Sequence, residues 1–429
     1  MITLFGKYTN ANIMIDEVEP ECISQITKMI NNQAFTNPVV IMPDTHAGKG
    51  SVIGFTMPLG KYIIPNVIGV DINCGMLGFK IPKEIDLNLE RIDQQIRNKI
   101  PFGFDTHQKS VVNMNDFNWA TVNGNCQNMV VRYNQKFGTN YNPIKYDMAW
   151  FIDKCEKIGC SYKRATTSLG TLGGGNHFIE FGKDSADDTW IIIHTGSRNF
   201  GKCICEYWQN IASKVVVNEK KEELRKEIEE IQKNYKGMEI KYKTQEVKAK
   251  YDLKSKSDLD FLEGEYAIGY LRDMLFTQRY AEFNRQVIAQ IIAKTLGFKY
   301  VEDSIETAHN FIDFGNFIIR KGAIEAAVTQ RMLIPLNPKD GTLVCIGKGN
   351  ADWNYSAPHG AGRLMSRSAA KKNITKEQAE KALEGVFASQ KPLDESPLAY
   401  KSSSLIEESI GDTALIIDRI KPILNMKSS

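Results

Sequence analysis

The sequence predicts a fold that mixes β-strands with α-helices, because segments of both kinds alternate along the chain. Short apolar runs that end in acidic residues, such as residues 38–44 (PVVIMPD), are typical of buried strands. Residues 87–100 have the spacing of an amphipathic helix, and residues 265–297 have apolar residues at helical spacing before a glycine, which predicts long core helices. No linker divides the 429 residues, so one large domain with insertions is as compatible with the sequence as two or three domains.

Further strands are predicted on both sides of the long helices. Residues 67–73 (VIGVDIN) form an apolar run that ends in polar residues, and residues 189–197 (TWIIIHTGS) run into a histidine and a glycine turn. Strands return at residues 316–328 and 341–349, and residues 413–429 predict a strand or a short helix with a basic tail.

A densely charged segment covers residues 218–256. It has helical propensity and few apolar anchors, and its acidic and basic residues are interleaved. The interleaving favours a solvated helical excursion over an arm that binds nucleic acid.

Composition excludes several classes of protein. A net charge of +3 is too small to indicate nucleic-acid binding by itself, and no apolar run is long enough to span a membrane. The first residues become polar too early for a secretory signal, and the eight cysteines lack the dense spacing of a disulfide framework. We therefore expect a cytoplasmic protein.

Histidines and their neighbours are the most informative residues of the chain. There are only six, and most lie in glycine-rich or polar surroundings: His46, His107, His177, His194, His309 and His359. Asp71 and Cys74 lie three residues apart, a spacing that can aim a carboxylate and a thiolate at one point, although an isolated pair of this kind is more often structural. Glycines before Asn176 and His177 allow backbone N–H groups to approach a phosphate.

Together these residues suggest a metal site with a nucleophile beside it. One carboxylate, one thiolate and three imidazoles suit a transition metal better than Ca²⁺ or Mg²⁺, and one thiolate can bridge two ions. His359, in the glycine-flanked stretch SAPHGAGRLMSR, is then a candidate covalent nucleophile rather than a further ligand. Arg363 and Arg367 of the same stretch can balance phosphate charge.

The ordered set of motifs resembles the RtcB family of RNA ligases. The resemblance is carried by DTHAGKGSVIG, GVDINCGM, SLGTLGGGNHFIE, HTGSRNFG, HNF, RKGA, HGAGRLMSR and NMK, which extend from about residue 40 to residue 427. It implies a single compact α+β domain over residues 1–429, with β-sheets around a central dinuclear metal cleft, helices outside, and the excursion at 218–256 as an addition.

The resemblance implies a ligase that depends on GTP and Mn²⁺. Such a ligase joins RNA ending in a 2′,3′-cyclic phosphate or a 3′-phosphate to RNA with a 5′-hydroxyl, sometimes with an activating protein. His359 would attack the α-phosphate of GTP and form a GMP–histidine intermediate. GMP would then pass to the RNA 3′-phosphate, and the 5′-hydroxyl would displace it.

Site residues are implied in the same way, by motif position. Asp71, Cys74 and His177 match ligands of one Mn²⁺, and Cys74, His194 and His309 match ligands of the second. Arg198 and Arg363 match residues near the RNA ends, with Arg164 as a weaker candidate. The implied nucleotide contacts are Asn176, His177, Glu180, His309, Asn310, His359, Gly360, Ala361, Gly362 and Lys427.

The loop at residues 335–342 (PLNPKDGT) departs from the nucleotide loop that is usual in the family. Glu180 is the expected carboxylate that reads the N1–H and N2–H₂ donors of guanine, and Asp340 in the altered loop is its rival.

Two other functions stay open at this point. A metal-dependent phosphoesterase that opens cyclic phosphates without ligation would need the metal ligands but not His359. A non-catalytic RNA-binding protein would tolerate loss of the ligands, and all of them are present here.

Overall fold

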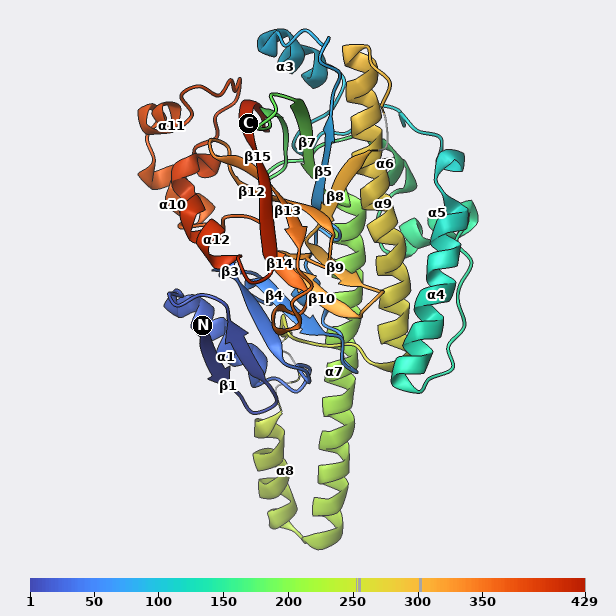
Figure 1. Ribbon diagram of the computed structural model, residues 1–429. Helices are drawn as coiled ribbons and strands as arrows, with labels where there is room; N and C mark the ends of the chain where they lie inside the picture. The colour runs from blue at the N-terminus through green and yellow to red at the C-terminus, as the bar shows by residue number, and fades with distance from the viewer. Residues whose placement is uncertain (252, 254–255, 301–302, 429) are drawn as a thin grey trace.

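The computed structural model describes residues 1–251, 253, 256–300 and 303–428 (Figure 1). Its strands are β1 (Ile2–Phe5), β2 (Asn10–Ile13), β3 (Val39–His46), β4 (Ile53–Pro58), β5 (Gly75–Lys80), β6 (Phe178–Lys183), β7 (Thr189–Thr195), β8 (Ser304–Ala308), β9 (Asn310–Asp313), β10 (Ile318–Lys321), β11 (Ala323–Glu325), β12 (Arg331–Asn337), β13 (Gly341–Gly347), β14 (Ser356–Pro358) and β15 (Ala414–Met426).

Helices occupy much of the remaining described chain. They are α1 (Pro20–Ile30), α2 (Pro65–Ile68), α3 (Leu89–Arg97), α4 (Trp119–Phe137), α5 (Met148–Lys157), α6 (Tyr162–Thr167), α7 (Arg198–Asn234), α8 (Met238–Lys250), α9 (Gly264–Leu296), α10 (Arg367–Asn373), α11 (Lys376–Ala382) and α12 (Ser403–Ser409). None of the described helices is long and apolar enough to cross a membrane.

Two larger sheets and a short ribbon form the centre of the molecule. The six-stranded sheet has the order β1-β2-β3-β4-β10-β9, and the seven-stranded sheet has the order β12-β13-β15-β6-β7-β5-β8. Strands β11 and β14 pair separately. Strands β2 and β3 run parallel, and the other pairs in these sheets are antiparallel.

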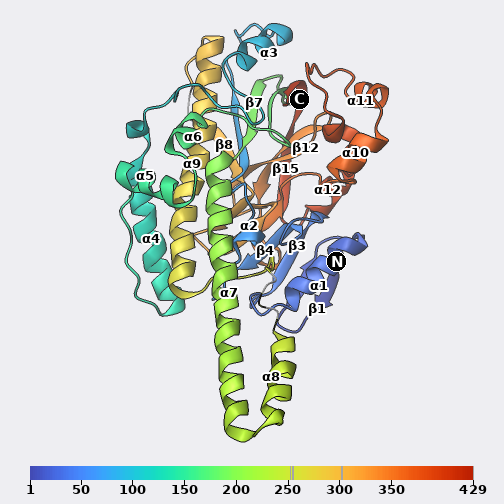
Figure 2. The ribbon, with the colours of Figure 1, turned by 180° about the vertical axis from the view of Figure 1, so that it is seen from behind.

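Helices cover the sheets from outside, as Figures 1 and 2 show. Helix α9 packs on the seven-stranded sheet, where its Ile288 and Ile292 share an apolar cluster with Ile191 and Ile193 of β7. It ends at Gly297, whose φ of 81° in the left-handed region closes the last turn. The predicted α+β class, with sheets at the centre and helices outside, is confirmed.

Most of the predicted elements are also confirmed. The apolar run at 38–44 lies in β3, the amphipathic segment at 87–100 contains α3, and residues 189–197 contain β7. The core region at 265–297 forms a single helix, α9. The C-terminal segment, for which a strand or a short helix was predicted, forms the strand β15. Ser429 lies outside the described residues.

The strand predicted at residues 67–73 is wrong. The chain there ends the short helix α2 and turns through Gly69, whose φ is 100°, before β5 begins at Gly75. Pro65 occupies the first turn of α2, a position that suits proline because the N–H it lacks would have no partner there. An apolar run this short does not distinguish a strand from a buried helical turn.

The charged excursion at 218–256 is helical, as predicted, over the part that the structure describes. The outer half of α7 and the returning α8 form a hairpin that projects from the body (Figures 1 and 2). It has a small apolar core of its own, centred on Leu224, Ile231 and Val247. Residues 252, 254 and 255 of the predicted segment lie outside the described residues.

Candidate metal and nucleotide site

Four of the predicted metal ligands come from one edge of the seven-stranded sheet. Cys74 immediately precedes β5, His177 precedes β6, His194 lies near the end of β7, and His309 follows β8. Because β6, β7, β5 and β8 are antiparallel neighbours in this order, the starts of two strands and the ends of the other two meet at the same edge. Topology therefore brings together side chains that are up to 235 residues apart in sequence (309 minus 74).

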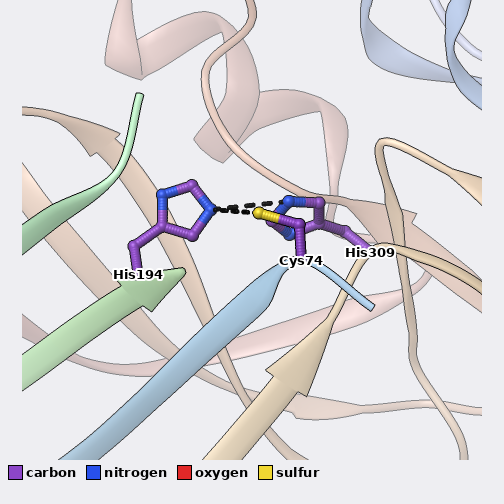
Figure 3. A group of neighbouring side chains, drawn as sticks. All are labelled: Cys74, His194 and His309. Carbon is purple, nitrogen blue, oxygen red and sulfur yellow. Dashed lines mark hydrogen bonds between the residues drawn. The ribbon is translucent and has the colours of Figure 1, made fainter. Parts of the chain in front are cut away.

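The donor atoms form two groups that share Cys74. One comprises Asp71, Cys74 and His177, the other Cys74, His194 and His309, and within each group the donor atoms lie within 4.8 Å of one another. Cys74 Sγ is 3.4 Å from His177 Nε2 and 3.3 Å from His194 Nε2. Figure 3 shows the second group, in which His194 Nε2 and His309 Nε2 are 3.4 Å apart.

Burial sets the protonation of this cluster. Burial lowers the pKa of His194 and His309 well below the usual value, which favours the neutral imidazole that binds metals. Burial, and secondly the charge of Asp71, raises the pKa of the Cys74 thiol well above its usual value. Burial opposes ionisation of Asp71, but His177, Cys74 and Arg198 together outweigh it and lower the pKa of Asp71 to about 2.

This donor set fits a pair of metal ions. A half-buried carboxylate, a shared thiol and three imidazoles offer more ligands than one open catalytic ion needs, and the mixture suits a transition metal. A cation would supply the positive charge that a buried Cys74 thiolate needs. The Nδ1 of His194 lies 3.0 Å from the Asn176 carbonyl, so this nitrogen donates its proton there and Nε2 keeps its lone pair for the cluster.

Two buried polar residues of α9 hold the loops that carry these ligands. The Asn284 amide accepts from Gly170 N and donates to the carbonyls of Thr171 and Gly196. Arg285 donates to the carbonyls of Asn73 and Thr195, and its guanidinium pairs with Glu306. Neither residue was predicted as a site residue, because the spacing of a long core helix does not indicate which of its polar side chains support a site.

His359 lies next to the cluster, and a hydrogen bond to Asp44 orients its ring. Its ring centroid is 4.8 Å from that of His309, and its Nδ1 is 2.6 Å from Asp44 Oδ2. The fully buried Asp44 also accepts a hydrogen bond from the backbone N–H of His359. A proton on Nδ1, held by the carboxylate, leaves Nε2 with a free lone pair.

Glycine is required at two close approaches around the site. Gly362 has φ 73°, and a Cβ there would collide with the backbone of Asp44, so the HGAG loop can pack on β3 only without a side chain. Gly173 has φ 101°, and a Cβ there would collide with the His177 ring and the Arg198 guanidinium.

A cavity of about 300 Å³ opens onto the metal cluster and His359. Glu180 lies in its wall; its Oε2 accepts from Asn425 Nδ2 at 2.8 Å, and its Oε1 has no hydrogen-bond partner among the described residues. Burial raises the pKa of Glu180 to about 8, against the opposing effects of Asn425 and Lys427. The wall contains the predicted residues Asp71, Cys74, Asn176, Glu180, His194, His309, Asn310, His359, Gly360, Ala361, Gly362, Arg363 and Lys427.

The predicted nucleotide contact Lys427 and the predicted RNA contact Arg363 meet at Glu395, a buried carboxylate. Lys427 Nζ is 2.8 Å and Tyr400 OH 2.6 Å from Glu395 Oε2, and Arg363 Nη1 is 3.1 Å from Oε1. Arg367, which is 43% exposed, approaches the same carboxylate at 3.4 Å. Arg363 is thus already paired within the protein, and Arg367 is the more open of the two arginines.

A larger groove of about 1560 Å³ begins at the other side of the cluster. Its wall contains Asp71, His177, Arg164, Arg198 and Arg367, so it shares Asp71 and Arg367 with the smaller cavity. The basic side chains around a long open groove are typical of a surface that holds a nucleic-acid backbone.

The altered loop at 335–342 forms the turn between β12 and β13, and several of its residues line the smaller cavity. Asp340 is absent from that wall, and its carboxylate accepts from Asn337 and Ser403 instead. Asn310 lines the cavity, but its amide also supports the fold, since it donates to the Asp71 carbonyl and accepts from Gly322 N.

Asp44, Glu395, Tyr400 and Asn425 were not predicted as site residues. Asp44 could have been found from its position two residues before His46 in the DTH motif, and Asn425 from its position two residues before Lys427. Glu395 and Tyr400 lie in a stretch without any motif that the sequence analysis identified.

Comparison with known proteins agrees with the motifs. A family model described as tRNA-splicing ligase RtcB matches residues 25–428. The RNA-splicing ligase RtcB of Escherichia coli K12 is 28% identical over 96% of this chain and 95% of its own length. The tRNA-splicing ligases RtcB of Nanoarchaeum equitans and Aeropyrum pernix are each 24% identical, over 96% and 90% of this chain and 91% and 86% of their own lengths.

Proposed function

Because this chain belongs to the RtcB family, we propose that it is an RNA ligase that uses GTP and two Mn²⁺ ions. It joins RNA ending in a 3′-phosphate or a 2′,3′-cyclic phosphate to RNA with a 5′-hydroxyl. The observation that carries the proposal is His359, an imidazole oriented by Asp44 at 2.6 Å and in ring contact with His309 of the metal cluster.

His359 has the role of nucleophile. Its Nε2 forms a bond to the α-phosphorus of GTP, the bond from that phosphorus to the bridging oxygen breaks, and pyrophosphate leaves. The ring gains positive charge as the bond forms, and Asp44, which accepts a hydrogen bond from Nδ1–H, stabilises that charge. Water first opens a cyclic end to a 3′-phosphate. GMP then passes from His359 to an oxygen of the RNA 3′-phosphate, and the attacking 5′-hydroxyl displaces GMP as the phosphodiester bond forms.

The two groups of ligands hold the metals. Asp71, Cys74 and His177 would hold one ion, and Cys74, His194 and His309 would hold the other, with Cys74 common to both groups. When bound, the ions act as Lewis acids that neutralise phosphate charge. Two observations support this assignment: burial favours the neutral imidazoles of His194 and His309, and the Cys74 thiol contacts both His177 and His194.

The cavity beside His359 takes the nucleotide. The Glu180 carboxylate, in its ionised form, accepts from the two guanine donors N1–H and N2–H₂, which adenine lacks. Lys427 lines the same cavity, and its charge favours that ionised form. The unpartnered Oε1 of Glu180 supports this role, because a buried acceptor without a partner is costly unless a ligand satisfies it. Asp340, the rival carboxylate, is not among the residues that line the cavity, which argues against it.

The larger groove takes the RNA. Arg198 lies beside His177 at Gly173 and holds a phosphate near the metals, with Arg164 further along the groove. Arg363 acts from the HGAG loop, and its pairing with Glu395 makes Arg367 a stronger candidate for direct contact than the sequence indicated.

Residues 1–429 form one ligase domain in this proposal. In support, the seven-stranded sheet contains strands drawn from residue 75 to residue 426. All eight cysteines are free thiols, which supports the predicted cytoplasmic location.

The test is incubation with α-labelled GTP and Mn²⁺, followed by a search for an acid-labile protein adduct. We expect the adduct and sealed RNA from the wild type, and neither from His359→Ala. Because only the first step needs the imidazole, His359→Ala should still seal RNA that already carries a GMP-activated 3′ end.

Bound metal in His359→Ala provides the control, since the imidazole is outside both ligand groups and the ions should stay. If the wild type opens cyclic phosphates but forms no adduct, the protein is a phosphoesterase and not a ligase. An adduct that persists in His359→Ala would move the nucleophile to another residue.

A further inference from the structure

Phe104 is the most exposed of the large apolar residues that the structure describes. It is 94% exposed. Its near neighbour Phe102 shows the usual alternative, since that ring packs at the edge of an apolar cluster with the Arg97 guanidinium 4.6 Å from its centroid. Single exposed apolar residues are common, so the position of Phe104 decides whether its exposure has a meaning.

A tight turn presents Phe104 to solvent. Asp105 N donates to the Phe102 carbonyl at 3.3 Å, and Gly103 within the turn has φ 65°. Gly103 N also donates to the Gly173 carbonyl at 2.8 Å, which attaches the turn to the glycine-rich segment before His177. The backbone of Phe104 is therefore well held although its ring is free.

Two arginines of the groove fix the same turn. Arg198 Nη2 donates to the Gly103 carbonyl at 2.9 Å, and Arg164 Nη2 donates to the Phe104 carbonyl at 3.3 Å. Phe104 lines the groove of about 1560 Å³ together with these arginines, His177 and Arg367. An exposed aromatic ring thus lies in the same groove as several arginines and the candidate metal ligand His177.

We propose that Phe104 is a stacking platform for one unpaired base of the RNA whose end lies at the metal cluster. Every base has a π-face, so aromatic stacking strengthens binding without selecting a sequence, while the arginines hold the phosphates. This inference rests on the proposed function, because it assumes that the groove holds RNA.

The experiment compares Phe104→Ala with the wild type in RNA binding and in the two chemical steps. Loss of a stacked base weakens RNA binding by about 5- to 150-fold. We expect that change in the Kd of a 3′-phosphorylated single strand, measured by fluorescence anisotropy without GTP, and a similar rise in the KM of RNA for sealing. The rate of GMP–protein adduct formation should stay unchanged.

Conservative variants separate stacking from simple apolar contact. Phe104→Trp keeps a π-face and should bind RNA at least as well as the wild type, whereas Phe104→Leu keeps apolar surface and should resemble Phe104→Ala. Phe5→Ala, the same change at an 84% exposed phenylalanine of β1 outside the groove, is the matched control and should behave as wild type.

An abasic scan then identifies the base. At one position near the RNA end, removal of the base should weaken binding to the wild type but not to Phe104→Ala, so that the two losses are not additive. Binding by Phe104→Ala equal to that of the wild type, full binding by Phe104→Leu, or strictly additive losses at every position would each overturn the proposal.

The outcome is separable from that of the proposed function. A wild type that seals RNA while Phe104→Ala binds RNA normally would refute the stacking platform alone. A wild type that forms no adduct, but whose RNA affinity depends on Phe104, would refute the ligase and leave the platform.

Discussion

The metal cluster and the helical hairpin of α7 and α8 place their polar residues in opposite surroundings. The cluster has one carboxylate, one thiol and three imidazoles, most of them buried, at one edge of a sheet. The hairpin has many charged side chains, and they face solvent on the outer half of α7 and on α8, which project from the body (Figure 1). Its ion pairs join residues three or four positions apart on one helix, such as Arg225 with Glu222 and with Glu229.

The difference shows that burial, rather than the number of charges, decides where a side chain can do chemistry. In the cluster, burial strongly lowers the pKa of His194 and strongly raises the pKa of Cys74. In the hairpin, water screens each charge, so the same residue types stabilise little beyond the helix that carries them. Four substitutions test this contrast, from the largest expected effect to the smallest.

The first substitution is Cys74→Ala. Because Cys74 is the residue shared by both ligand groups, we expect both metals to be lost together and sealing to fall by at least about 10³-fold. Metal content by mass spectrometry and sealing rate are the measurements. Cys126→Ala, at a buried cysteine of α4 outside the cluster, is the control and should keep both metals. Two bound ions and full activity in Cys74→Ala would rule out the bridge.

The second substitution is Asp44→Asn, which keeps the shape of the side chain behind His359 and removes its charge. We expect adduct formation to slow by roughly 10²- to 10⁴-fold, because the neutral amide has no negative charge with which to stabilise a positive ring. Metal content should stay at the wild-type level. An adduct rate within a few-fold of wild type would show that Asp44 is only structural.

The third substitution is Glu180→Gln, measured as a pH dependence of stability in the metal-free protein. The pKa of Glu180 rises from 4.5 to about 8 on folding, so between these values the folded state holds a proton that the unfolded state has lost. The free energy of unfolding should therefore fall as pH rises from about 5 to about 8, by more than about 1 kcal/mol from this group.

Urea denaturation of both proteins across that range isolates the effect, since other titrating groups are common to both. In Glu180→Gln this part of the slope should disappear. Equal slopes in the two proteins would mean that Glu180 is ionised in the folded state at neutral pH.

The fourth substitution is Arg225→Ala in the hairpin. Its two ion pairs are exposed, so we expect the free energy of unfolding to change by less than about 0.5 kcal/mol and sealing to stay unchanged. Chemical denaturation and the sealing assay are the measurements. A loss of several-fold in sealing would show that the hairpin takes part in the reaction, against the solvated excursion that the sequence favoured.

The sequence by itself determined which residue types are available and much of the local structure. Short apolar runs located β3 and β7, and helical spacing located α3 and α9, because each of these elements buries one face or its whole length and needs matching apolar residues. The order of the motifs was enough to identify Asp71, Cys74, His177, His194 and His309 as candidates, and the structure brings their donor atoms into two groups.

Only the tertiary structure decided how these residues meet. The pairing of Asp44 with His359 spans 315 residues, and Glu395 joins Lys427 to Arg363 from a segment without a motif, so no local pattern could reveal either contact. The turn at residues 67–73 was mistaken for a strand for the related reason that short apolar runs fit either structure until their neighbours are known. Local spacing shows which face of an element a side chain occupies. The antiparallel order of β6, β7, β5 and β8 decides which strand ends, far apart in sequence, meet at one edge of the sheet.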